Sequence, residues 1–174
     1  MKVAVIGAGG VGGYFGARLA QAGHDVTFVA RGRHLAAIRE HGLAIESALG
    51  DATVRCPATD DLSALGPGNV AMLCVKLWDV EATAPKLAGI VSNGGVVIPF
   101  QNGVESADRV TAALGPSHVL GGIAYIAATI RAPGVIAHTV GTQIFVASKR
   151  PPRPTSRITR SSCCSAKYRK AMAV

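Results

Sequence analysis

The feature that most constrains the fold of this sequence is a glycine-rich stretch close to its first residue. Residues 7–12 read GAGGVG and follow an apolar run, VAVI at 3–6, that predicts a buried strand. A helical pattern begins directly afterwards. In that context glycines permit a tight turn, close approach of the backbone to a pyrophosphate and close packing of a helix on a strand. The residues expected to form this dinucleotide-binding loop are Gly7, Ala8, Gly9, Gly10, Val11 and Gly12.

The helix after the loop is predicted from its apolar spacing. Val11, Phe15 and Leu19 are four residues apart and therefore share one helical face, and Gly23 stands where a C-terminal cap belongs. The start of such a helix directs free N–H groups and the positive end of its dipole toward a phosphate.

Strands and helices alternate along the rest of the first 147 residues. Apolar runs predict strands at 25–30, 70–75 and 96–98. Helices are expected at 33–41, at 104–114, and from residue 79, where Pro85 should kink or divide the helix. Asp61 is expected to cap a brief turn. Shorter strands are predicted at 43–46 and 52–55, which Gly50-Asp51 would join as a hairpin. Further strands are predicted at 119–127 and as a hairpin of 134–139 with 142–147 around Val140-Gly141. This alternation predicts one α/β domain over residues 1–147, with a Rossmann-like, doubly wound and mostly parallel sheet.

Polar residues follow the ends of several predicted strands. After the glycine loop at the first strand come Arg31, Lys76 and the run Gln101-Asn102-Gly103. Parallel α/β sheets bind ligands beyond the carboxyl ends of their strands, so these groups are expected to converge on one crevice. Taken singly, Arg31 and Lys76 could be solvated surface charges and Asn102-Gly103 a simple turn.

Arg31 favours NADP over NAD as the cofactor. A domain that binds NAD usually carries Asp or Glu about 20 residues beyond the glycines, whereas an arginine accommodates a 2′-phosphate. Arg31 occupies that place, and Arg33 and His34 follow it.

The net charge of +8 is confined to the end of the chain. Residues 148–174 contain eight of the 18 basic residues and no acidic residue, so residues 1–147 carry ten charges of each sign. A nucleic-acid partner is not expected, because the basic segment lacks interleaved aromatic residues and a recognisable fold.

Cysteine usage and hydropathy predict a cytoplasmic protein. Cys56, Cys74 and the adjacent pair Cys163-Cys164 have neither metal-ligand spacing nor the pattern of a disulfide framework. No apolar run reaches the roughly 18 residues of a membrane span, and Met1-Lys2 leads directly into the first strand. We therefore expect no metal, no signal peptide and no membrane partner.

With these residues assembled, the chain resembles the N-terminal domain of the 2-dehydropantoate 2-reductase (ketopantoate reductase) family. The resemblance rests on GAGGVGGYFGARLAQAGHDVTFVAR at 7–31, VKLWDVEA at 75–82, and PFQNGVES at 99–106 followed by LGGIAYIAA at 120–128. It implies an NADPH-dependent oxidoreductase that reduces a small 2-keto acid, ketopantoate, to pantoate for pantothenate and coenzyme A biosynthesis. It further implies that Gly7 to Gly12 hold the pyrophosphate and Arg31 the 2′-phosphate, with Lys76 and Asn102 near the nicotinamide and the keto acid.

The resemblance ends near residue 147. The resemblance implies that the proton donor of the family is a lysine of a second, all-helical domain. No such domain is recognisable in this sequence. Residues 148–154 read SKRPPRP, and the following Ser, Arg and Cys residues have no helical periodicity. Such a composition cannot bury enough apolar surface to fold. The sequence therefore predicts a basic, disordered tail over 148–174, as a truncated or frame-shifted gene would produce.

Two classes of function remain open at this point. The first is a ketopantoate reductase by descent, reduced to its cofactor-binding domain. The second is a non-catalytic NADP-binding module whose basic tail binds an acidic partner. A homo-oligomer is compatible with either class, and turnover of ketopantoate distinguishes the two.

Deletion of residues 149–174 is expected to leave the stability of the domain nearly unchanged, because that segment has no apolar stripe with which to pack. Thermal unfolding of the full and the shortened chain measures the effect. A drop in melting temperature of more than about 4 °C, equivalent to about 1 kcal/mol or more in a chain of this size, would contradict the predicted boundary.

Overall fold

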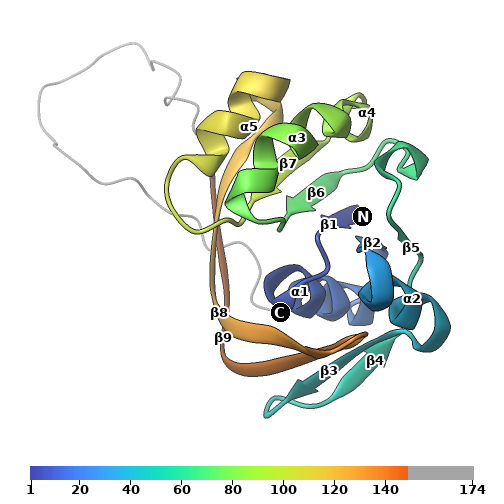
Figure 1. Ribbon diagram of the computed structural model, residues 1–174. Helices are drawn as coiled ribbons and strands as arrows, with labels where there is room; N and C mark the ends of the chain where they lie inside the picture. The colour runs from blue at the N-terminus through green and yellow to red at the C-terminus, as the bar shows by residue number, and fades with distance from the viewer. Residues whose placement is uncertain (149–174) are drawn as a thin grey trace, which may run out of the picture.

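A five-stranded parallel sheet forms the centre of the domain in the computed structural model, which describes residues 1–148 (Figure 1). The strand order is β5-β2-β1-β6-β7, and all four neighbouring pairs are parallel. The strands are β1 (Lys2–Ile6), β2 (Asp25–Val29), β5 (Ala58–Thr59), β6 (Val70–Leu73) and β7 (Val96–Pro99). The winding reverses between β1 and β6, which confirms the predicted Rossmann-like α/β fold. Of the tail expected at 148–174, only Ser148 lies within the described residues, as the last residue of a strand.

Each face of this sheet has its own hydrophobic core, because side chains alternate along a strand. Val3 and Val5 of β1 pack with the first two helices, α1 (Gly10–Gln21) and α2 (Gly32–His41). Ala4 and Ile6 face the opposite core, which is completed by α3 (Val80–Thr83), η3 (Ala84–Leu87), α4 (Ala88–Val91) and α5 (Ser106–Leu114). Helices on both faces explain why residues 3–6 are all buried and read as one apolar run.

The helix boundaries follow local signals in the sequence. Gly42 and Gly115 follow α2 and α5 with φ of +87° and +82°, a conformation that glycine adopts without steric cost. Pro85 divides the helical region after residue 79 into α3, η3 and α4, as predicted. The helix α5 begins at Ser106, two residues later than the sequence pattern indicated.

A second, four-stranded sheet has the order β4-β3-β9-β8. Its strands β3 (Leu43–Ser47) and β4 (Ala52–Val54) form the predicted antiparallel hairpin. The predicted hairpin around Val140-Gly141 is wrong. Instead β8 (Leu120–Ala132) and β9 (Val135–Ser148) are two long antiparallel strands that turn at Pro133-Gly134. The physical reason is that pairing with β8 continues through Gly141, whose φ of +83° lies at a shift of register and not at a turn.

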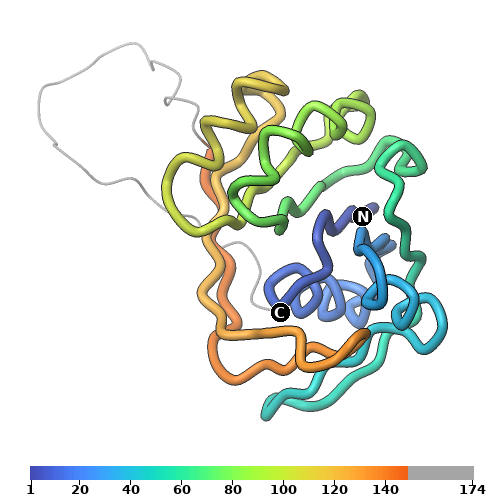
Figure 2. The backbone as a smooth tube through the Cα atoms, in the orientation of Figure 1, coloured from blue at the N-terminus to red at the C-terminus, as the bar shows by residue number. Residues whose placement is uncertain are grey.

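The β8–β9 ribbon joins the two sheets. It runs along one side of the domain, from β7 and α5 to the β3–β4 pair (Figures 1 and 2). At one end Val119 bridges to Val97 of β7, and at the other end β9 pairs in parallel with β3. Within the segment that pairs with β3, the buried His138 ring stacks on Tyr14 of α1, with 4.2 Å between ring centroids. The ribbon is therefore packed against the helix that follows the glycine loop.

His138 also stabilises the irregular step in β9. Its Nε2 donates to the Gly141 carbonyl at 2.7 Å, and its Nδ1 lies 2.8 Å from the Ser47 hydroxyl of β3. Buried polar atoms need such partners, because an unpaired donor or acceptor away from water costs about 1–3 kcal/mol.

Candidate functional site

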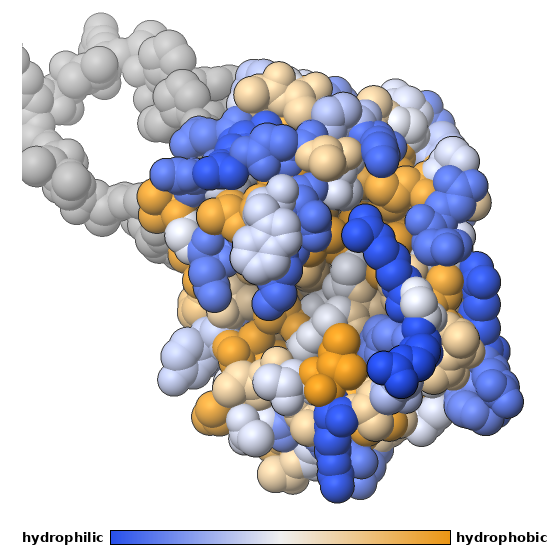
Figure 3. Space-filling model, viewed as in Figure 1, coloured by the Kyte–Doolittle hydropathy of each residue, from blue (hydrophilic) through white to orange (hydrophobic). Residues whose placement is uncertain are grey.

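A cleft of about 780 Å³ lies at the carboxyl ends of β1, β2 and β6. Its volume is in the range of ligand-binding pockets in proteins, about 300–1,000 Å³. Figure 3 shows this side of the molecule hollowed near its middle, with hydrophilic side chains on the rim. The cleft is lined by residues 6–9, 29–31, 60–63 and 74–76, together with His34, Asp79, Thr83, Lys86 and Ile130.

Glycine is required at different positions of the first βα loop for different structural reasons. Gly7 has φ of +100°, a conformation that other residues rarely adopt. A Cβ on Gly12 would lie 2.3 Å from the Gly7 carbonyl oxygen, so α1 can approach β1 only with glycine there. A Cβ on Gly9 would meet nothing within 4 Å. The space beside the Gly9 Cα is therefore open, and this residue lines the cleft.

Gly10 has a packing requirement that the sequence motif does not show. A Cβ on Gly10 would lie 2.0 Å from the carbonyl oxygen of Ala128 in β8. Glycine is thus required there by the crossing of the β8 backbone, and Gly10, Val11 and Gly12 are not among the residues that line the cleft.

The backbone of the loop is held in a fixed orientation. The N–H groups of Gly7 and Ala8 both donate to the Val29 carbonyl of β2, at 3.0 and 2.9 Å. The first-turn N–H groups of α1 have no acceptor within the helix, and no acidic side chain occupies that turn. This end of α1 therefore offers donors and a partial positive charge to an anion.

Arg31 lies at the end of β2, exposed on the cleft, and is the N-cap of α2. Its side chain makes no capping hydrogen bond to the helix. Arg31 and His34, a residue of the first turn of α2, both line the cleft, so a positively charged residue and the start of a helix lie beside it.

Lys76 follows β6 and is exposed on the cleft, so the structure brings it together with Arg31 and the glycine loop as expected. Cys74 lies deeper, and its burial raises the pKa of the thiol to about 12. A thiol with that pKa stays protonated near neutral pH and is no nucleophile.

Asn102 does not line the cleft and is exposed beyond the end of β7. Its neighbour Gln101 turns inward, and its side-chain amide donates to the carbonyls of Leu73 and Val75 at 2.8 and 3.0 Å. Gln101 therefore joins the ends of β6 and β7. Within residues 1–148 its buried Oε1 atom has no hydrogen-bond partner.

Several cleft residues carry no signal in the sequence motifs. Residues 60–63 form one wall, where Asp61 caps a short turn, as predicted, by accepting hydrogen bonds from the amide and hydroxyl of Ser63. These bonds lower the pKa of Asp61, so its carboxylate is ionised near neutral pH. Ile130 reaches the cleft from β8, about a hundred residues along the chain from Arg31, and only the tertiary structure shows it.

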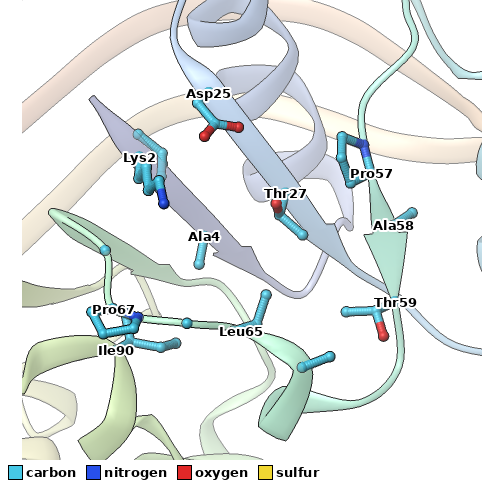
Figure 4. A pocket seen from close by; sticks show the side chains of 14 residues that line it. Lys2, Ala4, Asp25, Thr27, Pro57, Ala58, Thr59, Leu65, Pro67 and Ile90 are labelled. Atoms are coloured by element: carbon cyan, nitrogen blue, oxygen red, sulfur yellow. The ribbon is translucent and has the colours of Figure 1, made fainter.

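A second cavity, of about 300 Å³, lies at the opposite end of the sheet (Figure 4). Lys2 and Asp25, the first residues of β1 and β2, line it together with Thr27 and Thr59. None of the residues predicted to bind a dinucleotide lines this cavity, and parallel sheets bind ligands at the other ends of their strands.

The part of the chain that the structure describes contains no cluster of three or more potential metal ligands. Nor does any helix within residues 1–148 have the length and apolar character needed to cross a membrane.

An open parallel sheet whose glycine loop and first helix border a cleft at its switch point defines a Rossmann-like α/β domain. A family model described as ketopantoate reductase PanE/ApbA matches residues 3–151. The chain therefore belongs to the ketopantoate reductase family.

Individual relatives agree with this assignment. The uncharacterized oxidoreductase YkpB of Bacillus subtilis is 32% identical over 158 residues, which cover 91% of this chain and 52% of YkpB. The 2-dehydropantoate 2-reductase of Pyrococcus abyssi is 34% identical, over 80% of this chain and 45% of that protein. The crystal structure of a PanE/ApbA family ketopantoate reductase from Ralstonia eutropha is 35% identical with a TM-score of 0.79, over 84% of this chain and 49% of that one. The chain thus spans about half the length of these relatives.

The two central glycines of the loop should respond differently to the same substitution. Gly10→Ala places a methyl group against the β8 backbone and is expected to destabilise the domain by about 1–3 kcal/mol. Gly9→Ala meets open space and is expected to fold normally, yet to weaken dinucleotide binding at least about tenfold by filling the approach to the loop. Urea unfolding and calorimetric titration with NADPH measure the two effects. Equal stability of both variants would contradict the assigned role of Gly10.

Proposed function

We propose that this chain is the cofactor-binding part of an NADPH-dependent reductase of a small 2-keto acid, with ketopantoate as the substrate. The proposal rests on one observation. Gly9, which has open space beside it, lines the same cleft as Arg31 and Lys76. Membership of the ketopantoate reductase family supports the substrate.

The pyrophosphate of the dinucleotide is assigned to the glycine loop. Gly9 leaves room for it, and residues 9–12 supply backbone donors where α1 begins. Phosphate oxygens accept such N–H groups, and the helix dipole favours their charge. The remaining glycines, Gly7, Gly10 and Gly12, act by allowing the loop to adopt this shape.

The 2′-phosphate is assigned to Arg31. Hydrogen bonds between a guanidinium and a phosphate are charge-assisted and can be bidentate, so they are stronger than those between neutral groups. The start of α2 adds further positive character at the same place. An acidic residue at the position of Arg31 would instead suit the ribose hydroxyls of NAD.

The keto acid is assigned to the part of the cleft near Lys76. When bound, the reduced nicotinamide supplies a hydride to the 2-keto carbon. The ammonium of Lys76 attracts the substrate carboxylate and stabilises negative charge on the reacting oxygen. The resemblance assigns Asn102 a hydrogen bond to the substrate or nicotinamide, for which its amide must turn from its exposed position toward the cleft. The alternative of a non-catalytic module is not favoured, since the named relatives are oxidoreductases.

Replacement of Arg31 by alanine tests the cofactor assignment. The unmodified protein is expected to bind NADPH more tightly than NADH. Arg31→Ala should lower the affinity for NADPH by about 10- to 100-fold, as the loss of a charged hydrogen-bonding partner does, and should change the affinity for NADH little. Arg33→Ala is the matched control, because Arg33 is exposed in the same helix and does not line the cleft. Equal affinities of the unmodified protein for the two cofactors in calorimetry would contradict the assignment.

Turnover of ketopantoate by the 174-residue chain alone is expected to be very slow, although NADPH binds. The family resemblance assigns the general acid to a domain that residues 1–147 do not match, and general acid catalysis is worth roughly 10²–10⁴-fold. The decrease in NADPH absorbance, recorded with protein free of host reductase, measures the rate. A rate in the usual enzyme range of about 1–10³ s⁻¹ would show that a group within this chain, such as Lys76, donates the proton.

A further inference from the structure

The imidazole of His34 connects the glycine loop to the turn between β8 and β9. Its Nε2 lies 2.8 Å from the carbonyl oxygen of Ala8, and its Nδ1 accepts a hydrogen bond from the Gly134 N–H at 3.0 Å. His34 is partly buried in the first turn of α2 and lines the cleft. Three segments far apart in the sequence therefore meet at one ring.

These two contacts determine which ring nitrogen carries the proton. The Gly134 N–H donates to Nδ1, so Nδ1 presents its lone pair. A carbonyl oxygen can only accept, so Nε2 carries the hydrogen and donates it to Ala8. With both nitrogens occupied, the ring has no N–H left for a ligand.

The Gly134 end of this connection is a fixed point. Gly134 is buried with φ of +77°, and a Cβ on it would lie 3.0 Å from the Cβ of Ala37 in α2. Its carbonyl accepts from the Ala44 N–H of β3 at 2.8 Å. Because α2 and β3 fix the position of Gly134, the hydrogen bonds of His34 fix the glycine loop relative to the second sheet.

The bond to Ala8 sets the direction of one loop donor. A peptide unit is planar and trans, so its C=O and N–H point in opposite directions. Holding the Ala8 carbonyl on His34 turns the Gly9 N–H away from the ring. We propose that His34 is a positioning residue that presets the Gly9 N–H for the dinucleotide pyrophosphate. This inference rests on the proposed dinucleotide-binding function.

Two conservative variants separate the two bonds. His34→Gln retains an amide N–H long enough to reach toward Ala8. His34→Asn is one carbon shorter, so its amide is expected to replace only the acceptor for the Gly134 N–H. We expect His34→Asn to weaken NADPH and NADH by the same factor of about 3 to 10, the range that one hydrogen bond supplies, and His34→Gln to stay within about twofold of the unmodified protein. Equal factors are expected because both cofactors contain the pyrophosphate.

The matched control is His41→Gln, an exposed histidine of the same helix, which should change neither affinity. A purely structural role would make the two His34 variants lose affinity in step with their melting temperatures. Equal losses in both variants, or a loss confined to NADPH, would overturn the inference while the proposed function stands. Failure of the unmodified protein to bind either dinucleotide would overturn the proposed function and this inference with it.

Nitrogen-15 NMR of the unmodified protein gives a test that needs no folded variant. The ring nitrogen shifts of His34 are expected to show the proton on Nε2. A proton on Nδ1 would break both hydrogen bonds as assigned and would reject the positioning role.

Discussion

The site depends on how closely the backbone of α1 approaches β1 on one side and β8 on the other. A side-chain carbon at Gly12 would lie 2.3 Å from the carbonyl oxygen of Gly7, directly after β1, and one at Gly10 would lie 2.0 Å from that of Ala128 in β8. A close-packed interior cannot yield by such amounts without shifting whole elements. Glycine at both positions therefore places the start of α1 at the carboxyl end of β1, directly after the cleft-lining residues 6–9.

The β8–β9 ribbon acts as a brace for this arrangement. It contacts β7 at one end and β3 at the other, and polar side chains hold it along the way. His138 bonds across to β3 through Ser47, and His34 bonds the turn at Gly134 to the glycine loop. A hairpin tied at these points gives the loop a defined position relative to α2, which an isolated βα unit would lack.

Local backbone dipoles, rather than the net charge of the domain, make the cleft favourable for an anion. Residues 1–147 carry no net charge, and the lining includes carboxylates such as Asp61 as well as Arg31 and Lys76. What favours an anion is the start of α1, reinforced by a guanidinium at the end of β2. The thiol of Cys74 stays neutral beneath the loop, so it adds no competing charge.

The sequence by itself determined the parallel strands, the glycine turn, the break at Pro85 and the cap at Asp61, because these depend on periodicity and backbone preferences within a few residues. It also placed Arg31 and Lys76 at strand ends that do share a cleft. Only the tertiary structure decided that Asn102 lies outside that cleft, that Ile130 and His34 line it, and that Val140-Gly141 is no turn. Those outcomes depend on strand register and on contacts such as His34 with Gly134, which are 100 residues apart, and no local pattern encodes them.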